Sequence, residues 1–306
     1  MTKNNVLKGV VLVGLGATSY GMLATFVKLA YSDIGITGNP YTPAEVISSQ
    51  FLIGIAVILL INFYMKSKST TPVVKASGTN IKQLMLAGTS TGLTSIFYYL
   101  AVKYIPVSIG IVLLMQTVWM GVLLEWLLEK KRPSNIKIVA VFVVLFGTAL
   151  ATNILKSETL PDWRGIVLGL LAAASFTTTM FTANRVAVGI SSAQRSLYML
   201  LGGAVIVFIF ALATQNTPFN YDIFYKWGII VALFGTIIPP MLMNAGFPHT
   251  GIGLGSIVSA LELPVSVMMA FFLLGEEVIL LQWMGILLII LAIVMMNISF
   301  KKRAIA

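Results

Sequence analysis

The chain has 306 residues, of which 58% are hydrophobic and only 10% are charged, so it has too little polar surface for a soluble domain and is an integral membrane protein. It contains no cysteine, which excludes structural disulfides, thiolate metal sites and thiol catalysis. The net charge of +10 would suit nucleic-acid binding, but the lysines and arginines lie in short segments between apolar stretches, where they are a signal of membrane topology instead.

Ten apolar segments follow one another along the chain. Each is about 20 residues long, which is the length that a helix needs to cross a bilayer. They lack the ten-residue alternation that is typical of outer-membrane barrels. We therefore predict an all-α integral membrane protein with ten transmembrane helices, at about residues 6–30, 44–65, 81–102, 106–128, 136–155, 165–188, 195–213, 226–247, 251–274 and 278–300.

The positions of the basic residues predict the orientation, because cytoplasmic loops of membrane proteins are enriched in Lys and Arg. With the N-terminus in the cytoplasm, fifteen of the twenty basic residues, Arg195 among them, fall on the cytoplasmic side. We therefore expect a multi-pass protein of the cytoplasmic (inner) cell membrane with both termini in the cytoplasm. Acidic residues such as Glu45 and Asp222 are expected in outer loops or at helix ends, in contact with water. The basic residues left for the outside are Lys28, Lys103, Lys156, Arg164 and Lys226.

The two halves of the chain resemble each other. An offset of 156 residues aligns Ser19-Tyr20 with Ser175-Phe176, and an offset of 147 aligns Met115 with Glu262. Because five helices per half is an odd number, the second half enters the membrane with the opposite polarity. We predict two inverted five-helix repeats, at 1–155 and 156–306, which is the plan of many secondary transporters.

Prolines interrupt two of the predicted helices. Pro239 and Pro240 lie inside the eighth segment and remove two helix hydrogen bonds, so this helix should be kinked or broken. Such a break is tolerated at that depth only against protein or a wet cavity. Pro264 should kink the ninth helix in the same way. Asn244, one turn after Pro240, is a candidate substrate-binding residue because the freed carbonyls lie close by.

Glu262, near the middle of the ninth segment, is the strongest candidate for a functional residue. A charged side chain at that depth costs roughly 2.5–3.5 kcal/mol on insertion scales, so it usually faces a bundle interior or water. On a helix it shares a face with Ser259 and with small residues, which predicts an inward position and adds Ser259 to the candidates. Glu262 is predicted to bind a cationic substrate or to carry the coupling proton. The alternative is a hydrogen-bonded Glu that pins the ninth helix to the eighth.

Other candidates come from the repeat and from polar stripes. Gln116 can donate and accept hydrogen bonds, and Trp119 offers a surface for stacking, although core packing is the slightly favoured interpretation of Trp119. Gly88 and Gly92 have the G-x-x-x-G spacing, which fits either helix packing or a cavity wall. A hydroxyl stripe on the sixth helix has the same two interpretations, and for most of it we favour packing. The remaining predicted binding residues are Tyr20, Tyr98, Tyr99 and Thr178.

Over its whole length the chain resembles the EamA-type branch of the drug/metabolite transporter superfamily. The matching stretches include GATSYGMLATFVK, VLLEWLLEKKRPS and SALELPVSVMMAFFLLGEE. Glu129 and Glu276 hold the acidic positions that end the fourth helix of each half in that family, whereas Gln50-Phe51 stands where the family often has Arg-Phe. The resemblance implies two inverted five-helix repeats, a central cavity lined mainly by helices 1, 3, 4, 6, 8 and 9, and export of small metabolites.

The leading functional prediction is a secondary transporter that exports an amino acid, an aromatic compound or an organic cation by alternating access, with proton coupling as a further hypothesis. No G-x-x-x-x-G-K-[ST] loop is present, so a gradient must supply the energy. The alternatives are an intramembrane enzyme, for which His249 as the only histidine offers no catalytic constellation, and a channel-like facilitator without ion coupling. We expect a small-molecule substrate and membrane lipid as partners, no nucleic acid, no cofactor or metal, and a monomer or homodimer.

Overall fold

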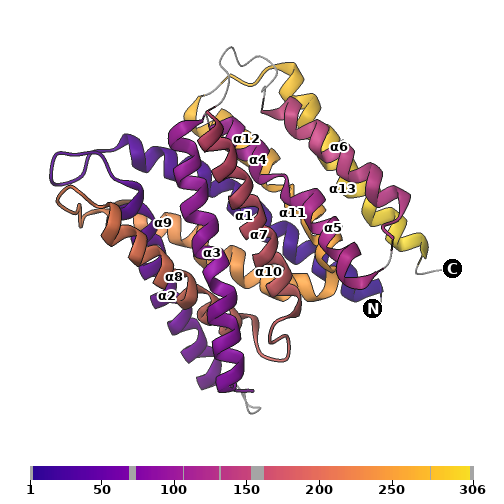
Figure 1. The fold of residues 1–306 in the computed structure, drawn as a ribbon, viewed down its shortest axis with the longest axis horizontal. Helices are drawn as coiled ribbons and strands as arrows, with labels where there is room; N and C mark the ends of the chain where they lie inside the picture. Colours follow the sequence, from indigo (N-terminus) through magenta and orange to yellow (C-terminus); the bar gives the residue numbers. More distant parts are fainter. Residues whose placement is uncertain are drawn as a thin grey trace.

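The computed structural model describes residues 3–68, 74–105, 107–130, 132–152, 162–275 and 277–303. The predicted boundary between the repeats at 155/156, together with Lys156 and Glu276, lies outside these ranges. The described chain is almost entirely helical (Figure 1), with π-helical turns labelled η. Its elements are α1 (Lys3–Ser32), α2 (Pro43–Lys68), α3 (Gly78–Tyr104), α4 (Val107–Leu114), α5 (Thr117–Glu129), α6 (Asn135–Ala151), α7 (Trp163–Arg185), α8 (Ser192–Thr214), η2 (Phe224–Gly228), α9 (Ile229–Ala232), η3 (Leu233–Ile237), α10 (Ile238–Thr250), α11 (Ile252–Ser259), α12 (Glu262–Leu274) and α13 (Leu280–Arg303).

All ten predicted segments overlap helical residues, and the protein is a multi-pass membrane protein. Within the described residues, α6 and the apolar stretch Leu280–Met296 of α13 are short, and α3 is long but rich in Gly, Ser and Thr, which lowers its hydropathy. By length and apolarity, seven stretches of the described chain can therefore cross a membrane: Asn5–Ser32, Pro43–Lys68, Ile109–Glu129, Trp163–Arg185, Ser192–Thr214, Phe224–Thr250 and Ile252–Leu274.

The helices of the two halves pack in corresponding ways. Helix α1 of the first half packs against α10 and α11 of the second half, and its counterpart α7 packs against α3 and α4 of the first half. The broken fourth and ninth segments meet through α5 and α11. The last helices of the halves, α6 and α13, lie side by side along one edge of the molecule, and α2 and α8 pack together away from them (Figure 1). This pairing is what a two-repeat architecture requires.

The fourth and ninth segments are both broken at corresponding places. In the ninth, α11 ends at Ser259 and α12 begins at Glu262. Pro264 has no amide proton to donate to the carbonyl of Ala260, which explains this break. In the fourth, α4 ends at Leu114 and α5 begins at Thr117, although no proline is present there. The first break was predicted from Pro264, whereas the second has no local signal in the sequence.

The eighth segment was predicted to kink or break at its proline pair, but it is not broken there. The helix remains continuous but widens into the π-helical turns η2 and η3, and η3 ends directly before Ile238-Pro239-Pro240. There the amide of Ile238 donates to the carbonyl of Leu233, five residues back. Such π turns inside α-helices are frequent at functional sites.

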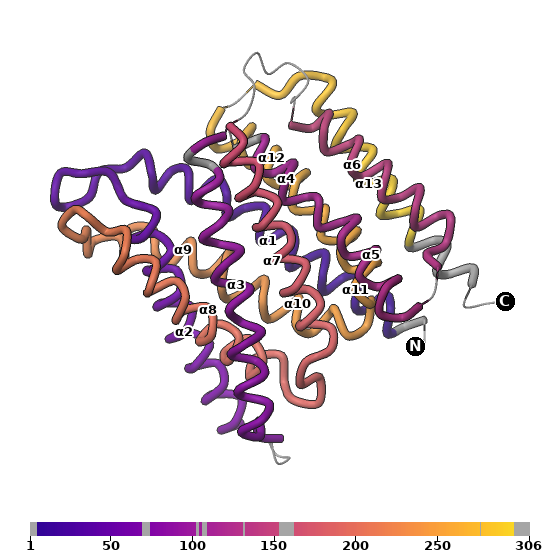
Figure 2. Tube along the Cα trace, in the orientation of Figure 1, coloured from indigo at the N-terminus to yellow at the C-terminus, as the bar shows by residue number. Residues whose placement is uncertain are grey.

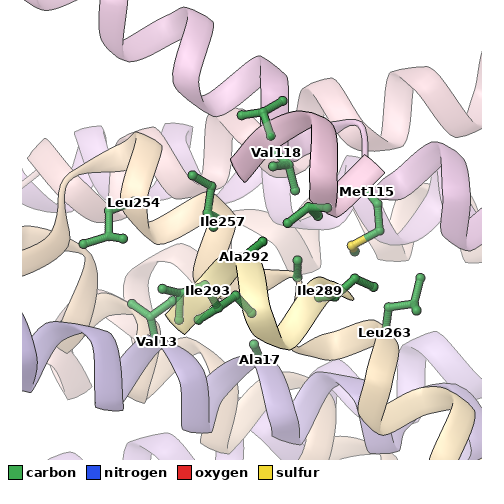
Figure 3. Close-up of a cluster of buried hydrophobic side chains, with 14 of the residues drawn as sticks. Val13, Ala17, Met115, Val118, Leu254, Ile257, Leu263, Ile289, Ala292 and Ile293 are labelled. Carbon is green, nitrogen blue, oxygen red and sulfur yellow. The ribbon is translucent and has the colours of Figure 1, made fainter. Parts of the chain in front are cut away.

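The largest apolar cluster holds the two halves together around the break in the ninth segment. Figure 3 shows how side chains from α1, the α4–α5 break, α11, α12 and α13 converge there. This packing fixes α12, and with it Glu262, against α1. The labelled side chains are Val13, Ala17, Met115, Val118, Leu254, Ile257, Leu263, Ile289, Ala292 and Ile293.

Two glycines bring the backbones of α3 and α8 into direct contact. A Cβ atom added to Gly88 would lie 1.8 Å from the carbonyl oxygen of Met199, and one added to Gly202 would lie 1.9 Å from that of Met85. Small residues permit such close helix approach in membrane proteins. Of the two interpretations of the G-x-x-x-G spacing, the structure therefore favours helix packing for Gly88.

Candidate functional site

A cavity of about 390 Å³ lies between the two halves of the molecule, within the size range of small-molecule sites. Residues of α1, α3, α4, α7, η3 and α12 line it, in agreement with the helix set that the resemblance implies. Helix α2 also contributes, through Gln50 and Phe51. The cavity extends from Tyr20 and Glu262, in the middle of the bundle, to Lys28 where α1 approaches its end.

Glu262 lies on the wall of this cavity, at the first residue of α12. Its Oε2 atom is buried and has no hydrogen-bond partner. Gly21 of α1 allows the close approach that places it there, because a Cβ atom at Gly21 would lie 2.4 Å from the carbonyl oxygen of Glu262. The alternative in which a hydrogen bond pins Glu262 to the eighth helix is therefore not supported for this oxygen.

Aromatic side chains form much of the remaining wall. Tyr98 and Tyr99 of α3 meet edge to face with ring centroids 6.3 Å apart, and Tyr99 meets Tyr31 of α1 at 6.1 Å. Tyr20 of α1 meets Phe176 of α7 at 6.0 Å in the same manner. All five rings line the cavity. The structure thus brings the predicted residues Tyr20, Tyr98 and Tyr99 together with Glu262.

A second, much smaller cavity of about 30 Å³ adjoins the first, and the two share Tyr20 and Phe176 on their walls. These are the residues that the repeat aligns with each other. Asn244, a predicted binding residue, lines the small cavity, donates from Nδ2 to the Oγ of Ser196 at 2.9 Å, and leaves its buried Oδ1 without a partner. Thr91 and Thr179 also line both cavities, so the Tyr20–Phe176 ring pair and these two hydroxyl side chains lie between the large cavity and Asn244.

Arg195 lies next to the small cavity, where it contacts the backbone of Asn244. We call this end of the molecule the terminal side, because α1 begins there and its Gly9 packs against His249 at the end of α10. Arg195 is only 2% exposed, and its guanidinium donates to the carbonyls of Val186 (3.0 Å), Ala183 and Asn244. It does not lie in a solvated loop, as the count of basic residues assumed, because those backbone carbonyls replace water as its partners. The contacts tie α7, α8 and α10 together.

The opposite end, the loop side, holds a buried polar network between the segment that joins α1 to α2 and the segment that follows α8 (Figure 2). Glu45 is completely buried and accepts hydrogen bonds from the amides of Asn220 (2.6 Å) and Thr42 (2.7 Å). Asp222 is 3% exposed and accepts from the hydroxyl of Tyr41 at 2.6 Å. The expectation that Glu45 and Asp222 contact water was wrong, because tertiary contacts supply their hydrogen-bond donors.

The charge of Asp222 is stabilised by this network. Burial alone would raise the pKa of Asp222, but hydrogen bonds from Tyr41, the amide of Ile36 and Lys226 hold the pKa below its ordinary value. The same burial and the neighbouring Asp222 raise the pKa of the Tyr41 hydroxyl. Asp222 therefore contributes stability that is complete at neutral pH and is lost as the pH falls through its lowered pKa.

Asp222→Asn should lower the thermal stability of the detergent-solubilised protein at pH 7, by about 1–3 kcal/mol, because the charged hydrogen bonds to Tyr41 and Lys226 are weakened. The difference from the wild type should shrink below about pH 4, where Asp222 of the unfolded wild-type chain begins to take up a proton while the folded carboxylate is still charged. Thermal unfolding followed by circular dichroism from pH 3 to 8 would measure it. A difference that stays constant over this range would contradict a charged Asp222.

Several predicted residues lie outside the large cavity. Gln116 donates to the carbonyl of Val112 and accepts from the indole of Trp119, which is 37% exposed. Ser259 is buried and donates to the carbonyl of Gly255. Thr178 is exposed on α7 and donates to Ala174, whereas its neighbour Thr179 faces the cavity. Because the two threonines are adjacent, the rotation of α7 about its axis decides which of them faces the cavity. The sequence does not reveal this rotation.

The sequence analysis did not select several wall residues. Gln50 is 4% exposed, and its Oε1 is buried without a partner. Tyr31 and Phe176 also line the cavity. Phe176 could have been selected as a wall residue because the repeat aligns it with Tyr20. Gln50 could have been selected because it stands where the family often has an arginine. In the described part of the chain, no three His, Asp or Glu side chains come together as a metal site would require.

Comparisons with known proteins agree with the two-repeat fold. The model of the EamA-like transporter family matches residues 7–153 and again residues 163–298, one match for each repeat. A solved structure, described only as the crystal structure of a protein, aligns with a TM-score of 0.73 at 15% sequence identity, over 95% of this chain and 97% of that chain. At this identity the likeness shows a shared fold. Among curated proteins, no sequence matches the chain.

Proposed function

We propose that this chain, which belongs to the EamA-like transporter family, is a secondary transporter that exports a small organic metabolite across the cytoplasmic membrane by alternating access. The observation that carries the proposal is the aromatic cavity in the middle of the bundle, with the unpartnered carboxylate oxygen of Glu262 on its wall. A buried polar atom without a hydrogen-bond partner costs free energy. Binding of a substrate or a proton at Glu262 would remove this cost.

The orientation predicted from the basic residues makes the terminal side cytoplasmic. The large cavity then faces the outside through Lys28, and Arg195 together with the Tyr20–Phe176 pair closes the path to the cytoplasm. In this proposal the structure is the outward-facing state. A transport cycle would separate α7, α8 and α10 at Arg195 and bring the walls together at the loop side, with the two inverted repeats exchanging roles.

Coupling to protons forms part of the same proposal. Glu262 would bind either a proton or the substrate, so that a proton taken up from the outside replaces the substrate that leaves. Inward movement of the proton then drives outward movement of the substrate. The polar atoms of the small cavity, at Asn244 and Ser196, provide a step between Glu262 and the cytoplasmic side.

Exchange in proteoliposomes tests the proposal. The full chain is reconstituted, the vesicles are loaded with one unlabelled solute, and uptake of the same labelled solute is measured for amino acids, aromatic compounds and organic cations in turn. A carrier should give saturable uptake that is stimulated by the internal solute, with a turnover below roughly 10³ s⁻¹. Uptake that does not saturate and is not stimulated would indicate the channel-like alternative, and no uptake above protein-free vesicles would reject transport of these classes.

A further inference from the structure

We propose that the central cavity selects a compact organic ammonium as its substrate. This inference rests on the proposed transport function and specifies the ligand of the same cavity. It starts from the buried polar atoms that the described wall leaves without partners, because these atoms show what a ligand must supply.

The unsatisfied atoms on the wall are mainly acceptors. Glu262 Oε2 and Gln50 Oε1 are both buried without a hydrogen-bond partner, and both residues line the cavity. Gly235 also lines the cavity, and its carbonyl lacks the usual helix donors, because the residues four and five positions after it are Pro239 and Pro240, which have no amide proton. Only the hydroxyl of Tyr31, which can also donate, completes this set. A ligand that satisfies such a wall must bring several hydrogen-bond donors.

The aromatic rings favour a positive charge on that ligand. Tyr20 and Tyr98 line the same cavity as Glu262, and Tyr99 packs against Tyr98. The faces of aromatic rings attract ammonium groups, and the attraction is stronger where water is excluded. An ammonium group combines a positive charge with up to three donors, so a single ligand group matches the carboxylate, the unpartnered acceptors and the rings.

The distribution of basic residues argues against an anion. Lys28 is the one basic residue on the described cavity wall, and it lies eight residues beyond Tyr20 along α1, which is about 12 Å of helix rise toward the loop side. A carboxylate at the level of Glu262 would face another carboxylate, the unpartnered oxygen of Gln50 and the tyrosine rings. The deep part of the cavity is therefore complementary to a cation.

A series of ligands with one shape and three charges tests this inference. We would measure binding of 2-phenylethylamine, 2-phenylethanol and 3-phenylpropionate to the purified full chain by isothermal titration calorimetry at pH 7. The amine should bind at least about tenfold more tightly than the alcohol, and the acid more weakly still. Equal affinities, tighter binding of the acid, or no binding of the amine would overturn the inference.

Substitutions at Glu262 and Gln50 test whether these wall residues cause the preference for the amine. Glu262→Gln should reduce the preference for the amine over the alcohol about tenfold, and Gln50→Leu should weaken binding of the amine with a smaller effect on the alcohol. Glu277→Gln is the matched control, because it makes the same chemical change at an exposed residue outside the cavity. A preference for the amine that survives in Glu262→Gln would contradict the assigned role of this carboxylate.

Exchange measurements separate the two proposals. If the vesicles exchange the alcohol or the acid but not the amine, the transport function stands and the cation selectivity is rejected. If the amine binds with the expected preference but no solute is exchanged, the site assignment stands and the transport function is rejected.

Discussion

Glu262→Gln should reduce substrate accumulation driven by a pH gradient about tenfold or more, while the purified protein remains folded. Glutamine has nearly the same shape as glutamate but can neither carry the negative charge nor exchange a proton, so it removes the competition between proton and substrate. The residual exchange between equal solute concentrations should no longer depend on pH. Initial rates in proteoliposomes between pH 5.5 and 8.5 would measure both effects.

The control for this experiment is Glu277→Gln, which changes an exposed carboxyl group and should retain accumulation driven by the pH gradient. Thermal unfolding of both variants would show that the loss is not caused by misfolding. If Glu262→Gln accumulates substrate as the wild type does, with the same dependence on pH, Glu262 is not the coupling residue and the proton must use another group.

Gly88→Ala should strongly destabilise the protein, although it adds a single methyl group. That group would lie 1.8 Å from the carbonyl oxygen of Met199, and because the obstacle is backbone, α3 and α8 must move apart. Overpacking typically costs about 1–3 kcal/mol, and more where the backbone must shift. We expect a lower yield of monodisperse protein and a clearly lower midpoint of thermal unfolding.

A second glycine on the facing helix makes the test specific. Gly202→Ala should have a similar effect, since its methyl group would lie 1.9 Å from the carbonyl oxygen of Met85. The double variant should be less destabilised than the sum of the single variants, because one separation of the helices relieves both clashes. Gly78→Ala, in the first turn of the same helix α3 and with open space around it, should be neutral. Equal stability of the Gly88→Ala and Gly78→Ala variants would contradict the close contact.

Features that depend on local chemistry were predictable. The distortion at Pro239-Pro240 and the break before Pro264 follow from missing amide protons, whatever surrounds them. The candidate role of Glu262 follows from the cost of a charge inside a membrane. By contrast, the break between α4 and α5 contains no proline and depends on how this segment packs against its neighbours.

Features that depend on rotation about a helix axis were less predictable. Thr178 and Thr179 are adjacent on α7, yet the first is exposed and the second lines the cavity. Trp119 and Gln116 bond to each other instead of lining the cavity. In a soluble protein, polar residues mark the outer face of a helix. Lipid and a protein core are both apolar, so in a membrane protein the hydrophobic pattern says little about which face of a helix points inward.

The sequence by itself determined that this protein crosses a membrane many times, is built from two related halves and places a carboxyl group inside the apolar region, because length, apolarity and proline act locally. Only the tertiary structure decided that Glu262 lines one cavity together with Gln50 and five tyrosines, and that Arg195, Glu45 and Asp222 are buried rather than solvated. These positions arise from contacts between helices far apart in the chain, whose partners a single sequence does not specify.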